Sequence, residues 1–264
     1  MLKIKHHAGF FSCTSVKLHH IIEYYNKEKK LPEYIDCSEI FYLYKPTSLM
    51  MEDITHHFFS TSNSNIIQYN KEINFNWNYQ FDIYKSLDIL SLVPFIQNYF
   101  SPTNEILSIK EYFIEKYKLN MNELCAVYYR GTDKFKETEL DIYESYIEQM
   151  KKISVKTYLI QSDDQKFIDI VKKNFTNIII IEENPTSYLN IGIHDQYTTN
   201  ENYVMIKILL ATILIMSKSK YFICSTSNCS LWAILYRGNT NNVFQNLNKK
   251  WITIVIQNYH SYQH

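Results

Sequence analysis

The segment Leu124–Phe135 reads LCAVYYRGTDKF, an apolar run that ends abruptly in charged and polar residues. The uninterrupted apolar stretch Leu124–Tyr129 predicts a strand that is buried on both faces, as strands of parallel sheets are. Arg130 then stands at the carboxyl end of this strand, where open parallel sheets present their ligand-binding groups. The segment therefore predicts an α/β protein with a binding site around Arg130.

Arginine is rare in this chain, which otherwise uses lysine for positive charge. Two arginines occur among 264 residues, Arg130 and Arg237, and a glycine follows each of them. A guanidinium is a rigid, permanently charged fork that grips phosphate or carboxylate through two hydrogen bonds. We interpret Arg130 as the group that holds the diphosphate of a nucleotide-linked donor; the alternative is a structural bridge to Asp133 or Asp163. Arg237 lies late in a predicted helix, where it neutralises that helix's C-terminal dipole.

The composition argues against several classes of protein. Lysine plus arginine equals aspartate plus glutamate at 27 each, so no basic field points to nucleic acid. A hydrophobic content of 46% is ordinary for a globular protein. The 5 cysteines are odd in number and form no CxxC pair. We therefore expect free thiols, with neither a disulfide framework nor a structural zinc ion.

We expect a cytoplasmic protein without a membrane span. The N-terminal residues MLKIKHHAGFF lack the apolar core of a signal peptide. The longest apolar stretch, Ile206–Met216, is too short to cross a bilayer and contains Lys207. The lysine- and asparagine-rich composition suits an A/T-rich intracellular microbe or large DNA virus, and a viral protein would lie in the host cytoplasm.

The chain alternates between predicted strands and helices after the polar segment Ser101–Asn104, which marks the internal boundary. The predicted strands are residues 124–129, 156–161, 177–181, 221–224 and 251–257, and the predicted helices are residues 140–153, 164–174, 203–217 and 230–236. This alternation is typical of a parallel sheet with helices on both faces. We divide the chain into an N-terminal α/β half, residues 1–112, and a Rossmann-type domain, residues 113–264. In the first half we predict a strand at Leu2–Lys5 and a helix at Val16–Tyr25 that Thr14 or Ser15 caps.

Three predicted strands end in polar clusters, namely Arg130–Lys134, Gln161–Asp164 and Cys224–Ser230. In a parallel sheet all three fall on the same carboxyl edge and converge on one crevice. Each cluster also has a structural alternative. The pair Asp163-Asp164 suits a helix N-cap, and Ser225–Ser230 suits a capping segment whose backbone N–H groups would equally make an anion site.

The order and spacing of these clusters resemble the fucosyltransferase superfamily of GT-B glycosyltransferases. The first cluster, YYRGTDK, is similar to the HxRRTDK-type signature of α1,6-fucosyltransferases. The segments LIQSDDQKF and FICSTSNCSLWAIL are similar to the SDD and SNSSFSWW segments of α1,2-fucosyltransferases. The resemblance covers residues 124–236. It extends more faintly to His7–Leu18, which occupies the place of the superfamily's glycine-containing N-terminal loop.

The resemblance implies a GT-B-like fold whose shortened N-terminal half faces the acceptor. It implies inverting transfer of a sugar, fucose above all, from a GDP-sugar to a glycan acceptor, with no resident cofactor. A permanently charged arginine with backbone N–H groups can stabilise the departing diphosphate without a metal, so we expect metal independence. Arg130 would hold the β-phosphate, and Glu137 or Glu139 would supply the catalytic base. The remaining donor-site residues implied are Thr132, Asp133, Asp163, Asp164, Ser225, Ser227, Asn228 and Ser230, with His7 and Gly9 from the N-terminal loop.

The chain departs from the family pattern at three positions. Tyr128 replaces a histidine, Gly131 replaces the second arginine, and Thr212 stands where an aspartate that contacts guanine is expected. The nucleotide and the sugar therefore stay open. Gly131 and Thr212 favour an alternative, a non-catalytic protein that binds a sugar nucleotide or a glycan. Arg130, the acidic pair Glu137 and Glu139, and the serine segment favour an enzyme. A third interpretation is an unrelated α/β protein whose motifs match by chance.

Other constellations have alternative interpretations. Cys13 near a predicted helix N-terminus, with His19 or His20, would be a nucleophile–base pair with a lowered thiol pKa. Adjacent histidines point in different directions in a strand or a helix, so we expect no metal site from them. The pair His194-Asp195 is interpreted as a solvated turn, with a contact to the donor base or the acceptor as the alternative.

Overall fold

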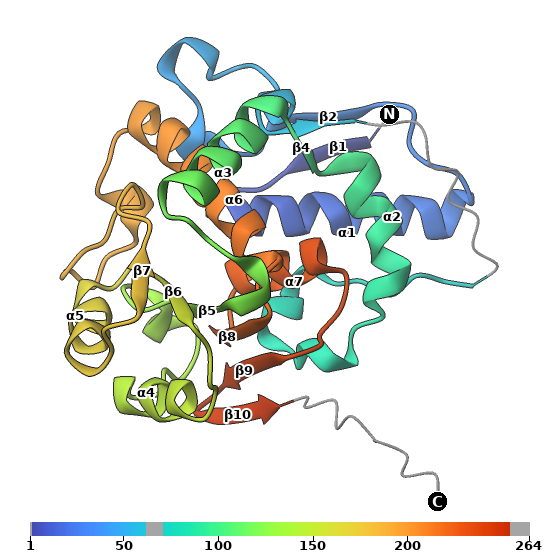
Figure 1. Ribbon diagram of the computed structural model, residues 1–264. Coiled ribbons are helices and arrows are strands. Elements are labelled where there is room, and N and C mark those ends of the chain that lie inside the picture. The colour runs from blue at the N-terminus through green and yellow to red at the C-terminus, as the bar shows by residue number, and fades with distance from the viewer. Residues whose placement is uncertain (1, 62–70, 254–264) are drawn as a thin grey trace, which may run out of the picture.

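The computed structural model describes residues 2–61 and 71–253. Its centre is a six-stranded sheet with the strand order β10-β9-β8-β5-β6-β7 (Figure 1). Neighbouring strands from β9 to β7 run parallel, and β10 pairs antiparallel with β9. The three predicted polar clusters follow β5, β6 and β8, so they lie on one edge of the sheet as expected.

The strands of this sheet are β5 (Leu124–Tyr129), β6 (Thr157–Ser162), β7 (Ile178–Ile180), β8 (Tyr221–Ser225), β9 (Val243–Leu247) and β10 (Lys250–Thr253). The helices are α1 (Phe10–Glu28), α2 (Ile89–Tyr99), α3 (Asn104–Lys116), α4 (Tyr143–Lys151), α5 (Gln165–Asn174), α6 (Thr199–Ser217) and α7 (Asn228–Arg237). Two further pairs of strands are β1 (Leu2–Lys5) with β2 (Ile35–Glu39), and β3 (Phe59–Ser60) with β4 (Ser101–Pro102).

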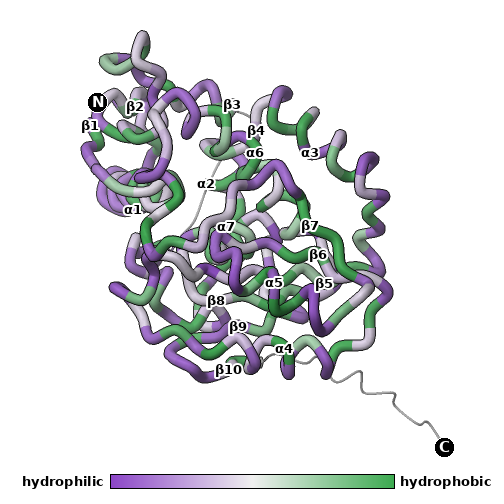
Figure 2. The backbone as a smooth tube through the Cα atoms, turned by 90° about the vertical axis from the view of Figure 1, so that its left-hand side faces the viewer, coloured by the Kyte–Doolittle hydropathy of each residue, from purple (hydrophilic) through white to green (hydrophobic). Residues whose placement is uncertain are grey.

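Successive side chains of β5 point into two different hydrophobic cores. Ala126 and Tyr128 belong to the larger core, which α1, α6 and α7 share, whereas Cys125 and Val127 belong to the smaller core under α4 and α5. Because both faces are covered, no position of β5 tolerates a charged side chain. The apolar β7 appears as a continuous green segment beside β6 (Figure 2).

The strand order contains a topological switch point. The chain passes from β5 outward to β6 and β7, and then returns through α6 to β8 on the other side of β5. The order is that of a Rossmann-type sheet, in which a crevice opens at the carboxyl edge where the direction reverses. The segments after β5 and β8 flank this point.

The N-terminal part is a smaller α/β unit, in which α1 connects the parallel strands β1 and β2. Helix α1 begins at Phe10 with Gly9 as its N-cap, so the predicted start at Thr14 or Ser15 was wrong. Both residues lie buried inside the helix, where Ser15 Oγ accepts a hydrogen bond of 3.0 Å from Trp232 Nε1. That bond ties α1 to α7.

The predicted fold class is confirmed: the chain is α/β, with a parallel Rossmann-type sheet in its C-terminal part and a smaller α/β unit before it. Strand β9 was not predicted, because Gln245 and Asn246 interrupt its apolar pattern. The final strand was predicted at residues 251–257. In the structure β10 begins at Lys250, and the part of the prediction beyond residue 253 lies outside the described residues. The larger core draws on both parts of the chain, and the division at residue 112 stays a prediction.

Helix α6 is the one helix among the described residues that is long and apolar enough to cross a membrane by length and composition. Of its most apolar window, 56% is buried inside the protein. The helix lies between α3 and α7, against the larger core. A helix that is apolar on most sides is also what such a central position requires. The expected absence of a membrane span stays a prediction.

Arg237 binds a different helix end from the one predicted. It is the last residue of α7, but its guanidinium donates to the carbonyls of Ser217 (3.3 Å) and Ser219 (2.5 Å) at the end of α6. It also donates to the carbonyls of Lys220 (3.2 Å) and Asn241 (2.9 Å). The arginine therefore satisfies carbonyls that the end of α6 leaves without partners.

We expect Arg237→Lys to lower the free energy of unfolding by ~1–3 kcal/mol, because a single ammonium cannot reach four carbonyls spread over this loop. Urea unfolding followed by circular dichroism measures the change. Lys173→Arg, an exchange at an exposed position of α5, is the control and should leave the midpoint where it is. An unchanged midpoint for Arg237→Lys would show that water satisfies these carbonyls equally well.

Candidate functional site

A cavity of about 360 Å³ opens at the carboxyl edge of the sheet, at the switch point between β5 and β8. Its walls come from the segments after β5, β6 and β8, from the start of α1, from one side of α6 and from the loop before α6. Its polar and charged lining residues include Tyr44, Gln80, Arg130, Asp133, Lys134, Glu137, Gln161, Asp163, Asn184, His194, Ser227 and Asn228.

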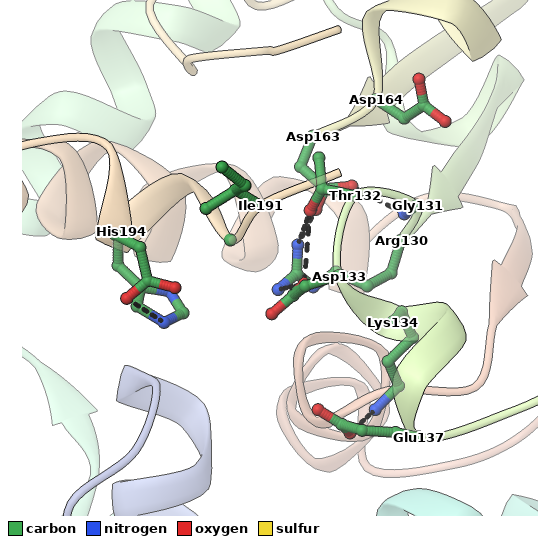
Figure 3. Close-up of polar contacts among 12 residues, drawn as sticks. Arg130, Gly131, Thr132, Asp133, Lys134, Glu137, Asp163, Asp164, Ile191 and His194 are labelled. Carbon is green, nitrogen blue, oxygen red and sulfur yellow. Dashed lines mark hydrogen bonds and ion pairs between the residues drawn. The ribbon is translucent and has the colours of Figure 1, made fainter. Parts of the chain in front are cut away.

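Arg130 forms ion pairs with two carboxylates in this cavity (Figure 3). One nitrogen of its guanidinium contacts Asp163, and another lies 2.5 Å from Asp133 Oδ1. The guanidinium also donates to Thr132 Oγ1 at 2.9 Å. The structural bridge that the sequence left as an alternative is therefore present, to Asp133 and to Asp163 together.

The two carboxylates are held differently. Asp163 accepts a hydrogen bond of 2.8 Å from the backbone N–H of Gly131 and one of 2.5 Å from the hydroxyl of Thr132. Asp133 is held mainly by Arg130, since the same hydroxyl lies 3.3 Å away and already donates to Asp163; 21% of the Asp133 side chain is exposed, against 9% for Asp163. Asp163 is thus a fixed part of the cavity wall, and Asp133 is the more accessible partner of Arg130.

Burial and neighbouring charges act in opposite directions on Arg130. Burial by itself disfavours the charged guanidinium, but the adjacent Tyr128 and Asp133 favour it more strongly, so the pKa of Arg130 is raised. Burial lowers the pKa of Lys134, although its partner Glu137 acts in the opposite direction. The cavity therefore holds a permanently charged arginine and a lysine that gives up its proton more readily than an exposed one.

Asp164 is the N-cap of α5, as one of the two interpretations predicted. It accepts a hydrogen bond of 2.9 Å from the backbone N–H of Lys166. Its other oxygen accepts one of 2.6 Å from the hydroxyl of Tyr143. Asp164 is 9% exposed and does not line the cavity. Asp164 lies behind Gly131 and limits the space available at that residue.

Gly131 has no room for a side chain. A Cβ atom at this position would lie 2.5 Å from Cβ and 2.6 Å from Oδ2 of Asp164, and 2.9 Å from Cε1 of Tyr129. The second arginine of the family signature could not fit here without moving the start of α5. The departure from the signature therefore follows from the close approach of the β5 and β6 ends.

The serine segment after β8 forms the start of α7. Ser227 is the N-cap, and its Oγ accepts a hydrogen bond of 3.1 Å from the N–H of Ser230. Ser225 Oγ accepts one of 2.9 Å from the N–H of Arg130, which joins this segment to the end of β5. Ser227 and Asn228 line the cavity, whereas Ser225 and Ser230 lie behind its wall. First-turn N–H groups have no partner inside their helix, so this end of α7 favours an anion.

Two buried amide oxygens at the cavity have no hydrogen-bond partner. They are Oε1 of Gln161 and Oδ1 of Asn184, each on a side chain that is 4% exposed. The amide nitrogen of Asn184 donates to Thr212 Oγ1 at 2.8 Å, so Thr212 orients Asn184 from behind and does not reach the cavity. Buried acceptors are normally satisfied, and these two are therefore suited to the donor groups of a ligand. No sequence motif marked Asn184.

The two glutamates proposed as bases lie in different surroundings. Glu137 lines the cavity, but its carboxylate accepts a hydrogen bond of 2.5 Å from Lys134 Nζ. The side chain of Glu139 is 71% exposed and pairs with Lys249 at 3.3 Å. Glu139 does not line the cavity. The structure therefore brings Glu137, and not Glu139, to the other candidate site residues.

The N-terminal loop contributes Gly9 to the cavity wall, but not His7. The exposed ring of His7 stacks on Tyr42 at a centroid distance of 4.5 Å. His194 lines the cavity instead, close enough to Gly9 that a Cβ there would lie 3.9 Å from its Cε1. Of the two interpretations of the pair His194-Asp195, the place of His194 in the cavity wall fits the ligand contact, whereas Asp195 is 54% exposed, as in a solvated turn. Figure 3 shows its ring facing Asp133 across the opening.

The pKa of His194 is lowered, chiefly because burial disfavours the imidazolium, and the positive charge of Arg130 adds to this effect. Asp195 and Asp133 act in the opposite direction but do not reverse the shift. The imidazole is therefore neutral at pH 7, and one ring nitrogen is free to accept a proton. The position of His194 depends on long-range packing against α1, which its sequence context does not reveal.

The cysteine–histidine alternative is not supported. The Cys13 thiol is buried and donates weakly to the carbonyl of Ala8 at 3.5 Å. Burial raises its pKa to about 11, the opposite of the lowering expected at a helix N-terminus. Within residues 2–61 and 71–253 there is no group of three or more histidine, cysteine, aspartate or glutamate side chains arranged to hold a metal ion.

Comparison with known proteins gives a likeness in structure only. No protein-family model and no curated protein sequence matches this chain. Two similar solved structures are of the NodZ alpha-1,6-fucosyltransferase, one co-crystallised with GDP and one soaked with GDP-fucose. The first has 12% identity and a TM-score of 0.36, covering 51% of this chain and 42% of the other. The second has 13% identity and a TM-score of 0.41, covering 56% and 47%. The match spans less than half of those enzymes and is too distant to assign an activity.

We expect Gly131→Ala to destabilise the protein by ~1–3 kcal/mol, because the new methyl group forces apart the ends of β5 and β6. Differential scanning fluorimetry measures the loss as a lower melting temperature. Gly9→Ala is the matched control, since its Cβ would meet Tyr44 and His194 at ordinary contact distances of 3.8 and 3.9 Å. Equal melting temperatures for the two variants would show that Asp164 can move aside for a methyl group at residue 131.

Proposed function

We propose that this protein is an inverting, metal-independent glycosyltransferase that moves a sugar from a nucleoside-diphosphate sugar to a glycan acceptor. The observation that carries the proposal is the position of Arg130. Its partly buried guanidinium lies at the carboxyl end of β5, at the switch point of a Rossmann-type sheet, in the same cavity as the N-terminus of α7. The resemblance of the sequence to fucosyltransferases makes GDP-fucose the first donor to test.

In this proposal the diphosphate replaces Asp133 as the outer partner of Arg130. Asp163 keeps its hydrogen bonds to Gly131 and Thr132, and so holds the guanidinium in the orientation that a phosphate needs. The first-turn N–H groups of α7 receive further phosphate oxygens. These groups together stabilise the negative charge that grows on the diphosphate as the glycosidic bond breaks, without reorganising at that moment.

The acceptor hydroxyl must lose a proton as it attacks the sugar, and His194 is the group best placed to take it. Its neutral imidazole lines the cavity opposite Arg130 (Figure 3). Glu137 is the second candidate, but the ion pair with Lys134 already compensates its charge. An imidazole that is neutral at the operating pH can accept the proton, which suits general-base catalysis.

Gln161 and Asn184 supply hydrogen-bond acceptors for the rest of the donor. Their free amide oxygens suit the N–H groups of a nucleobase or the hydroxyls of a sugar. Thr212, which stands where the family pattern has an aspartate, orients Asn184 through the hydrogen bond of 2.8 Å. We propose that Asn184 takes over the contact that the aspartate would make.

The charge of the cavity favours a second candidate function, binding of a neutral glycan without turnover. Three carboxylates, Asp133, Glu137 and Asp163, line the cavity beside the two cations Arg130 and Lys134. The resulting net negative charge opposes a diphosphate unless Asp133 withdraws. A neutral oligosaccharide meets no such opposition, and it would use the same free amide oxygens.

We expect GDP and GDP-fucose to raise the melting temperature, and EDTA to leave this shift unchanged. Asp133→Asn should strengthen GDP binding about tenfold, the equivalent of ~1.4 kcal/mol, because it removes the carboxylate that competes for Arg130. Arg130→Lys should weaken binding by a similar factor or more, because lysine cannot replace the two-pronged contact. Isothermal titration calorimetry with GDP measures both effects.

UDP and CMP are the comparison ligands, and Glu139→Gln is a control variant outside the cavity wall. Weaker GDP binding by Asp133→Asn would contradict the exchange of carboxylate for phosphate. If no nucleotide binds and a neutral oligosaccharide from a glycan array does, the second candidate function replaces the first.

We expect His194→Gln to reduce the slow hydrolysis of GDP-fucose, in which water takes the place of the acceptor, by about 10²–10⁴-fold while sparing GDP binding. In the wild-type protein the rate should fall as pH decreases through the lowered pKa of His194, because the imidazolium cannot accept a proton. The variant should lose this dependence. Phosphatase-coupled detection of GDP measures the rates. An unchanged rate for His194→Gln together with a reduced rate for Glu137→Gln would transfer the role to Glu137.

A further inference from the structure

Lys17 differs from the other buried lysines of the described chain in having no polar partner. Lys45 donates to three backbone carbonyls, Lys134 to Gln80 and Glu137, and Lys207 to Glu105. The side chain of Lys17 is only 3% exposed, and within the described residues its amine makes neither a hydrogen bond nor an ion pair. The amine lies 5.2 Å from the centroid of the Phe100 ring.

Lys17 lines a second cavity of about 660 Å³, which lies between α1, the loop before β2 and the strand β3. The two cavities have no lining residue in common. Three aromatic side chains, Tyr34, Phe59 and Tyr99, contribute to the walls of the second one. Its volume is sufficient for a small organic molecule.

A second polar group in this cavity also lacks a hydrogen-bond partner. The hydroxyl of Thr55 is buried without one, and only the weakly polar Cys37 thiol interacts with it. Asp53, by contrast, is fixed, because its two oxygens accept hydrogen bonds of 2.9 Å from the backbone N–H groups of Cys37 and Thr55. One wall thus carries an amine, a hydroxyl and an oriented carboxylate.

These groups define the chemistry of a possible occupant. A buried amine without a partner is stable only when it sheds its proton or meets a ligand. Burial indeed lowers the pKa of Lys17, although Cys37 and Asp53 act in the opposite direction. An unprotonated lysine amine is a nucleophile toward carbonyl carbon. The free hydroxyl of Thr55 suits a ligand hydroxyl.

We propose that the second cavity binds a small hydroxyaldehyde, with which Lys17 forms an imine. The amine nitrogen bonds to the carbonyl carbon, and the carbonyl oxygen takes up a proton to give a carbinolamine. This intermediate then loses its hydroxyl as water, and the proton that the nitrogen gives up passes through solvent to the leaving hydroxyl. One water is released, no oxidant or reductant is consumed, and the reaction is reversible.

Reductive trapping tests the proposal. The full-length protein is incubated with glyceraldehyde and sodium cyanoborohydride at about pH 7, and modified peptides are mapped by mass spectrometry. Lys17 should react several-fold faster than the exposed lysines, because burial leaves a larger share of its amine unprotonated at this pH. Lys45, which is equally buried but has three carbonyl partners, is the internal control and should stay unmodified. The proposal is overturned if Lys17 reacts no faster than exposed lysines, or as little as Lys45.

Two variants separate this role from a structural one. Thr55→Val keeps the shape of the side chain and should slow trapping at Lys17 several-fold without lowering the melting temperature. An unchanged trapping rate would show that the Thr55 hydroxyl does not contact the aldehyde. Lys17→Met should abolish the trapped peptide and raise the melting temperature, because an apolar side chain replaces an unpaired amine. Its affinity for GDP should equal that of the wild type, which distinguishes the second cavity from the first.

Discussion

The contact between Arg130 and Asp163 is the interaction on which the rest of the cavity depends. A guanidinium that is mostly removed from water at the end of β5 would be destabilising without a carboxylate beside it. Asp163, at the end of the neighbouring strand, supplies that carboxylate and is itself satisfied by the N–H of Gly131 and the hydroxyl of Thr132. The ends of β5 and β6 are therefore drawn so close together that residue 131 has to be glycine.

The same contact also determines which charges an incoming ligand meets in the cavity. With Asp163 fixed, Arg130 retains one outer position, and Asp133 occupies it. An anionic ligand gains the guanidinium only by displacing a carboxylate that is already close to it. The two candidate functions therefore use the same scaffold and differ at one point. A glycosyltransferase requires that Asp133 moves away from Arg130, whereas a protein that binds a neutral glycan does not.

The sequence could predict those parts of the fold that depend on local pattern. The apolar run of β5 requires two covered faces, and parallel strands place their polar ends on one edge, so Arg130 and the serine segment meet as expected. Strand β9 escaped prediction because Gln245 and Asn246 are buried there. Gln245 is satisfied by Tyr84 and by the carbonyl of Asp82, far away in the chain. Such long-range partners leave no local signal.

The candidate site was predictable to the same degree and for the same reason. Residues that directly follow a strand, such as Arg130 and Asp163, are placed by the sheet itself. Glu139 and His7 belong to loops, and the spacing of a loop does not determine which side of it faces the cavity. His194 lies in the site only because its loop packs beside Gly9 at the start of α1, more than a hundred residues earlier in the chain.

Buried polar groups without partners provide a signal that the sequence lacks. In a folded protein such groups are rare, since each costs about 1–3 kcal/mol. Here Gln161 and Asn184 border the first cavity, and Thr55 borders the second. A group that is merely misplaced could lie anywhere in the interior, as Nε of Arg237 does. Unpaired polar groups on side chains that line a cavity large enough for a molecule are better explained by a ligand than by imperfect packing, and this applies to the second cavity as much as to the first.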